Sequence, residues 1–93
     1  MNHSGIPIFR YGELRLTKGV DKLISHHAEL LPYIAKHITG DWGVLALDDK
    51  QSNDEALQFG GRLLSVYMFK ERKIWVMTEA DRRSTVVLLP EEY

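Results

Sequence analysis

Cysteine is absent from the 93-residue sequence. Its absence excludes disulfides, thiolate nucleophiles and cysteine-ligated zinc, and it is consistent with a reducing compartment. The sequence also has no apolar run near the roughly 18 residues of a membrane-spanning helix. Its first residues show no basic segment followed by an apolar run, the pattern of a secretory leader. We therefore expect a soluble cytoplasmic protein that does not bind membranes.

An excess of charge of one sign is missing too. The chain has 12 basic and 13 acidic side chains, a formal net charge of −1. Such a balance creates no field that would attract phosphate backbones or anionic lipids. Basic and aromatic residues do interleave over residues 62–83, as on some nucleic-acid platforms. Because these aromatics alternate with aliphatic residues at strand spacing, packing in a core or a dimer explains them better.

Local motifs of the common enzyme classes do not occur. The sequence has no phosphate-binding Gly-x-x-x-x-Gly-Lys, no Gly-x-Gly-x-x-Gly, no nucleophile elbow around a serine and no His-Glu-x-x-His. These absences disfavour an enzyme, and we expect no cofactor.

The chain does contain enough apolar side chains for one core. Apolar residues make up 44% of the sequence, and 93 residues leave no room for a second independent core. We expect one α+β domain over residues 1–93, in which residues 1–7 form a flexible tail. That tail includes His3, for which a ligand role is disfavoured.

Two short helices are predicted in the first half of the chain. Thr17 can cap a helix whose apolar residues recur at helical spacing over residues 20–31. His27 falls within this apolar stripe, which predicts a hydrogen-bonded core histidine. Pro32 suits the first turn of a second short helix, which Gly40 ends.

A third helix follows a loop that contains Trp42. This helix is predicted to begin at Asp48 or Ser52, after a polar stretch. It ends at the glycine pair at residues 60–61, which also lets the chain turn into a sheet.

Strands are predicted at both ends of the domain. Residues 8–16 form an N-terminal strand with Gly12 as a possible bulge. Residues 62–69, 73–78 and 85–89 are rich in β-branched and aromatic residues and are separated by short polar turns. They predict a three-stranded antiparallel meander that forms one sheet.

Both faces of this meander are predicted to be apolar. Leu64 and Val66 lie on one face of the strand at residues 62–69, whereas Leu63 and Tyr67 lie on the other. Helices must therefore cover both faces, or a partner must cover one of them. A homodimer or another protein partner is expected on this ground.

His37 and Asp41 are the first candidate polar pair. His37 lies near a helix C-terminus and precedes the loop at residues 40–43. In one interpretation, His37 caps the helix end and Asp41 holds the loop through its own backbone. In the other, His37 acts as a general base that Asp41 orients.

Glu79, Asp81 and Arg82 form a second polar cluster, in the turn at residues 78–84. Mixed charge at a hairpin tip is typical of a solvated turn. Alternatively, the two carboxylates bind a divalent cation and Arg82 stabilises developing negative charge. The further oxygen ligands that such a cation needs cannot be placed, so no metal site is predicted.

Two functions from different classes are consistent with these features. The favoured one is a non-enzymatic accessory protein that binds a partner through Trp42, Tyr67, Trp75 and Arg62. The alternative is a small metal-assisted hydrolase or nucleic-acid-processing enzyme that uses the two polar clusters.

The chain resembles a family of small bacterial proteins found mostly on plasmids and integrated elements. The resemblance covers residue 14 to the end and is carried by residues 37–43, Asn53, and residues 60–67, 74–82 and 88–93. Members are often labelled as plasmid-related proteins or as the modification subunit of a type I restriction enzyme. Such a subunit needs a cofactor-binding Rossmann-like domain and an Asn-Pro-Pro-aromatic motif, which this sequence lacks. The resemblance thus implies an accessory role on a mobile element, without an activity.

Overall fold

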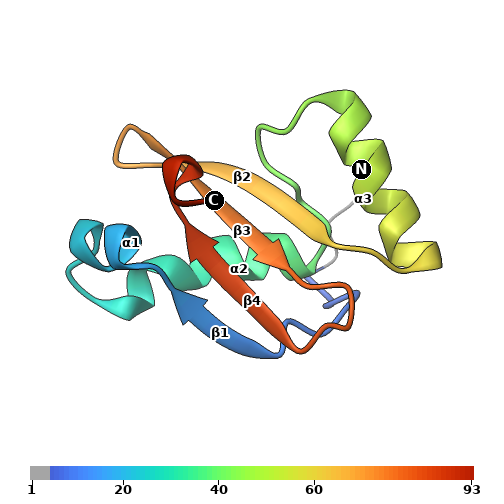
Figure 1. Cartoon of the computed structure of the whole chain (residues 1–93), viewed down its shortest axis with the longest axis horizontal. Coiled ribbons are helices and arrows are strands. Elements are labelled where there is room, and N and C mark those ends of the chain that lie inside the picture. The colour runs from blue at the N-terminus through green and yellow to red at the C-terminus, as the bar shows by residue number, and fades with distance from the viewer. Residues whose placement is uncertain (1–4) are drawn as a thin grey trace.

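A computed structural model describes residues 5–93, in which helices and a β-sheet form an α+β fold (Figure 1). Part of the predicted tail, residues 1–4 with His3, lies outside the described residues, and residues 5–7 are exposed. The elements in chain order are β1 (Glu13–Leu16), α1 (Lys18–Leu23), the 3₁₀ helix η1 (His27–Leu30), α2 (Leu31–Ile38), α3 (Leu47–Phe59), β2 (Leu63–Phe69), β3 (Arg72–Thr78), β4 (Ser84–Leu88) and the 3₁₀ helix η2 (Pro90–Glu92). None of the helices in this part of the chain is long and apolar enough to cross a membrane.

The sheet has four strands in the order β1-β4-β3-β2. Strands β2, β3 and β4 form the predicted antiparallel meander. The N-terminal strand pairs in parallel with β4, with Leu14 opposite Thr85, which makes the sheet mixed. This strand begins at Glu13 and not at residue 8. Gly12 ends the preceding segment because it has a φ of +66° and lies against the backbone of Arg83.

The first helix is shorter than predicted. Thr17 caps α1 as expected, but the helix ends at Leu23 and Ile24 is extended. The carboxylate of Glu29 accepts hydrogen bonds from the backbone N–H groups of Ser25 and His26. These bonds cap the start of the separate helix η1, so α1 does not continue through this segment.

The prediction of a core histidine at position 27 is therefore wrong. Because the chain leaves the helix before His27, this side chain is exposed and lies 3.6 Å from the Asp21 carboxylate. The two later helices agree better with prediction. Pro32 stands in the first turn of α2, and Gly60 ends α3 with a φ of +88°.

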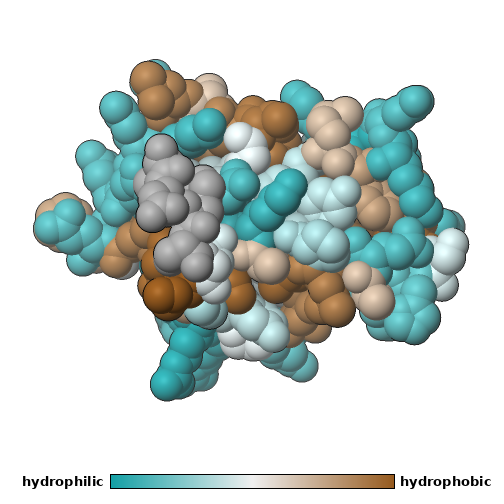
Figure 2. All heavy atoms as spheres, turned by 180° about the vertical axis from the view of Figure 1, so that it is seen from behind, coloured by the Kyte–Doolittle hydropathy of each residue, from teal (hydrophilic) through white to brown (hydrophobic). Residues whose placement is uncertain are grey.

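The main core lies between one face of the sheet and the helices α1, η1 and α2. Val20, Leu30 and Ile34 from these helices pack on strand residues such as Tyr67 and Val76. Figure 1 shows α2 behind the sheet, on the side opposite η2. Seen from the helical side, hydrophilic residues cross the middle of the surface, and hydrophobic ones lie in separate patches around them (Figure 2).

A smaller core cluster attaches α3 to the outer edge of β2. It consists of Trp42, Ala56 and Leu63. The loop before α3 adds backbone pairing to this edge, since the N–H of Val66 donates to the Trp42 carbonyl at 3.1 Å. Asn53 also pairs with this edge. Its side-chain amide donates a hydrogen bond to the Leu64 carbonyl and accepts one from the Leu64 backbone N–H. The exposed edge of β2 is thus largely occupied by the protein itself.

Gly43 is predicted to tolerate no side chain. A Cβ at this position would lie 1.9 Å from the Val66 carbonyl oxygen, and its φ is +77°. We expect Gly43→Ala to reduce the free energy of unfolding by about 4 kcal/mol or more in chemical denaturation. Gly60→Ala is the matched control, because Gly60 has a similar φ of +88° but no atom within 4 Å of the added Cβ. It should cost only the backbone strain, about 1–3 kcal/mol, and equal losses in both variants would contradict the prediction.

Candidate functional site

A chain of buried hydrogen bonds begins at His37, the most chemically promising side chain of the sequence. Its ring is 0% exposed. Nδ1 lies 2.6 Å from the Ser65 hydroxyl, and Nε2 lies 2.9 Å from the Thr78 hydroxyl. The Thr78 hydroxyl is 2.6 Å from that of Thr85, which donates to the carbonyl oxygen of Tyr11 at 2.8 Å. One ring from α2 is thereby joined to β2, β3, β4 and the segment before β1.

The direction of every hydrogen bond in this chain follows from its last acceptor. A carbonyl oxygen accepts only, so Thr85 uses its single proton on Tyr11 and must accept from Thr78. Thr78 then has no proton left for the ring and accepts from His37 Nε2–H. Nδ1 is consequently the acceptor, and Ser65 donates to it.

Burial keeps the His37 ring neutral. Desolvation, together with the positive charge of Arg82, lowers the pKa of His37 from 6.5 to about 3. The rings of Phe9 and Trp42 also meet the imidazole edge-on, with centroids 5.1 and 5.8 Å away. A neutral ring with both nitrogens bonded inside the core holds elements together, and it offers no free nitrogen to a substrate.

Asp41 does not orient His37. Its carboxylate accepts a hydrogen bond from the backbone N–H of Gly43 at 3.1 Å, so it holds its own loop as the simpler interpretation predicted. The Tyr67 hydroxyl donates to the Asp41 carbonyl oxygen at 2.5 Å, and burial raises the pKa of Tyr67. Trp42 is fixed in the same loop by donation from Nε1 to the Asp54 carboxylate at 3.2 Å.

Arg82 acts as a clamp on the backbone. Its guanidinium donates to the carbonyl oxygens of Gly61 at 2.6 Å, Glu79 at 3.0 Å and Ala56 at 3.1 Å. It thereby caps the C-terminal end of α3, where unpaired carbonyls collect. The guanidinium also lies 5.8 Å from the centre of the Phe9 ring. These contacts occupy the guanidinium that the catalytic alternative would use to stabilise a developing negative charge.

The two carboxylates of the same turn have local partners as well. Glu79 lies 3.5 Å from the Arg62 guanidinium, and the Asp81 carboxylate accepts a hydrogen bond from the backbone N–H of Arg83 at 3.0 Å. Within residues 5–93, no group of three or more His, Asp or Glu side chains is arranged to hold a metal ion.

All five candidate catalytic residues lie in the described part of the chain. No hydrogen bond or ion pair there joins the side chains of any two of His37, Asp41, Glu79, Asp81 and Arg82. Only the charge of Arg82 reaches the His37 ring.

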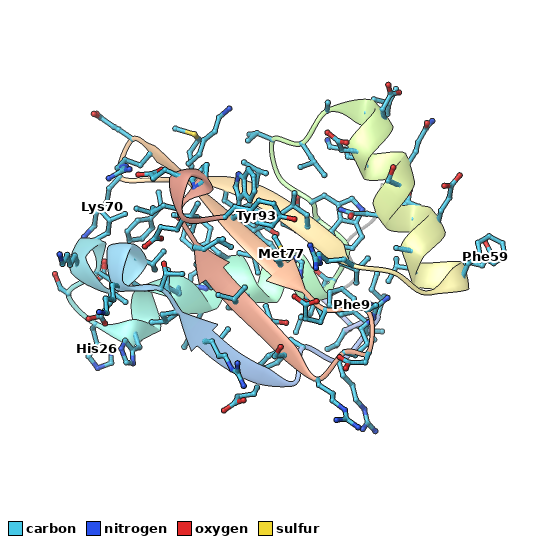
Figure 3. All side chains as sticks on the ribbon, in the orientation of Figure 1. Phe9, His26, Phe59, Lys70, Met77 and Tyr93 are labelled. Carbon is cyan, nitrogen blue, oxygen red and sulfur yellow. The ribbon has the colours of Figure 1, made fainter. Side chains whose placement is uncertain are left out.

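The other face of the sheet presents a groove of about 700 Å³. Leu64 and Val66 from β2 and Trp75 from β3 belong to its apolar floor. The residues that lead into α3 form one wall, and Pro90 of η2 lies on the other side. Figure 3 shows Tyr93 on the same side as this groove, and the Tyr93 and Trp75 ring centroids are 5.5 Å apart.

Of the four predicted binding residues, two line this groove. Arg62 and Trp75 border it, with the Trp75 ring partly exposed. Trp42 and Tyr67 are each 4% exposed and offer no ring surface to a partner.

No protein-family model, curated protein or solved structure matches the chain. The resemblance to small plasmid-borne proteins accordingly stays an expectation from the sequence.

Sequence reasoning did not assign roles to Ser65, Thr78, Thr85 or Asn53. The first three occupy strand positions with the same parity as buried apolar residues, such as Val76 beside Thr78. Because polar side chains at core-facing positions need hydrogen-bond partners, the parity of these strand positions is the signal that could have predicted buried hydrogen bonds there.

We predict that His37 makes stability depend on pH between 6.5 and 4.5. In this range the unfolded chain binds a proton at His37, whereas the folded chain, with a pKa of about 3, does not. The free energy of unfolding should thus fall as pH falls, by up to about 1.4 kcal/mol per pH unit. Glu29 and Glu92, whose pKa values are lowered, contribute only below their ordinary value of 4.5.

Urea denaturation at a series of pH values measures this slope. His37→Gln should flatten it, whereas His27→Gln, at an exposed position, should leave most of it in place. A wild-type slope near zero between these pH values would contradict the buried neutral ring, as would an unchanged slope in His37→Gln.

The hydrogen-bond directions also predict the tautomer of His37. Nitrogen NMR of the ring should show a proton on Nε2 and none on Nδ1, from neutral pH down to the onset of acid unfolding. Thr78→Val removes the acceptor for Nε2–H and should disturb the Nε2 signal most. A ring protonated on Nδ1 would show that the proton order is reversed.

Proposed function

We propose that this protein is a non-enzymatic accessory protein that binds a protein partner through the open face of its sheet. The observation that carries the proposal is the groove over Leu64, Val66 and Trp75. The helices α1, η1 and α2 cover the opposite face, whereas η2 lies on this face and α3 flanks the edge of β2 (Figure 1).

Large apolar side chains surround the groove and point into solvent. Val44 lines it. Met68 has the same parity on β2 as the floor residues, and Tyr93 stands against Trp75. The exposed fractions of Val44, Met68 and Tyr93 range from 49% to 70%. Exposed apolar residues gathered around a groove are typical of a protein interaction site.

The arrangement of ionisable groups favours binding over catalysis. His37 is enclosed, and Arg82 is occupied by backbone carbonyls. The rim of the groove carries Asp49, Arg62 and Lys73, which suit recognition of a charged and apolar protein surface. An accessory role on a mobile element, and a cytoplasmic location, agree with this proposal and stay predictions.

Site-specific photo-crosslinking tests the proposal. A photoreactive amino acid placed at Val44 or Lys73, both exposed at the groove, should yield a discrete covalent adduct in cells that produce the protein. The adduct mass then identifies the partner, including a second copy of the chain. The same amino acid at Glu55, an exposed position of α3 that does not line the groove, is the control.

The expected result is an adduct from the two groove positions and none from Glu55. A further change, Leu64→Lys, places a charge on the groove floor and should suppress the adduct without unfolding the protein, as judged by circular dichroism. The absence of adducts from both groove positions, or equal labelling from Glu55, would contradict binding at this face.

A further inference from the structure

We propose that the partner on the open sheet face is a second copy of this chain, docked face to face about a two-fold axis. This inference rests on the proposed function, because it uses the same groove and names its occupant.

Two opposite charges at the groove have no partner of their own. Asp49 belongs to the α3 side, and Lys73 belongs to β3, across the floor strand β2. Both side chains are exposed, and neither has a hydrogen bond or ion pair within residues 5–93. Arg62, the remaining charged residue at the groove, already contacts Glu79 and the Tyr93 hydroxyl.

A two-fold axis along the groove would pair these two charges. Such an axis lies in the plane of the interface and runs along the groove. Rotation about it exchanges the two sides of the groove, so a residue on one side of the first copy faces a residue from the opposite side of the second copy. Asp49 of each copy would then face Lys73 of the other, and the contact would occur twice. A foreign partner needs a separate complementary surface, whereas a second copy already carries it.

The apolar part of the face suits the same arrangement. The floor residues Leu64 and Val66 belong to β2, between the two charges, and would lie near the axis, where they meet the floor of the second copy. Trp75 shares β3 with Lys73 and would meet the α3 side of the second copy. The molecule measures 35 × 25 Å along the two directions of this face. A stable interface buries roughly 800 Å² per partner, so the contact must extend beyond the groove over most of this face.

Charge exchange at the rim tests the inference. Sedimentation equilibrium from micromolar to millimolar concentration should show a reversible dimer for the unaltered chain. Asp49→Lys and Lys73→Glu, each alone, place like charges opposite each other twice and should raise the dissociation constant by about tenfold or more. The double variant with both changes restores the attraction and should recover dimerisation.

Matched controls separate this effect from changes within one chain. Asp48 is in the same first turn of α3 as Asp49 but does not line the groove. Asp48→Lys therefore reproduces any loss of helix stability that Asp49→Lys causes by removing a carboxylate from this turn. Lys22→Glu makes the corresponding change at an exposed lysine away from the groove. Both controls should dimerise like the unaltered chain.

The outcomes distinguish this inference from the proposed function. A chain that stays monomeric at millimolar concentration overturns the second copy, while adducts from Lys73 to a different protein would still support the groove as a binding site. A dimer that neither charge variant weakens, or that the double variant fails to restore, forms through another surface and also overturns the inference. Absence of both the dimer and the adducts removes the two proposals together.

Discussion

The hydrogen-bond chain through His37 is the constraint on which the rest of the structure depends. A histidine and three hydroxyls are removed from water, and each would cost about 1–3 kcal/mol if it were left unpaired. They pair only when α2, β2, β3, β4 and the segment before β1 have their native positions. The network therefore specifies how the helix sits on the sheet, which apolar packing alone defines less sharply.

This closed face determines what the open face can be. The helices α1, η1 and α2 lie on the side of the His37 ring. The helix α3 is held at the edge of β2 by Trp42, Asn53 and the Arg82 clamp. Within residues 5–93, the short helix η2 and Tyr93 lie on the second face. The groove over Trp75 is thus a consequence of how the covering elements are distributed.

Local patterns in the sequence predict much of this fold. The meander, the capping Thr17, Pro32 in α2 and the stop at Gly60 each depend on a few neighbouring residues, and each is confirmed. The parallel pairing of β1 with β4 joins segments about 70 residues apart, and no local pattern encodes it. The early end of α1 follows from a competing cap by Glu29, which a periodicity of apolar residues does not reveal.

The candidate site was harder to predict for a physical reason. A histidine near carboxylates in the sequence looks the same whether it faces solvent or the core. The deciding information is the long-range pairing of His37 with Ser65 and Thr78, residues 28 and 41 positions away. Sheet parity, in contrast, is local: apolar residues on both faces of β2 and β3 are typical of strands buried on both sides. Leu64, Val66 and Trp75 have that composition, although their own chain leaves a groove over them, and this agrees with the proposed partner site.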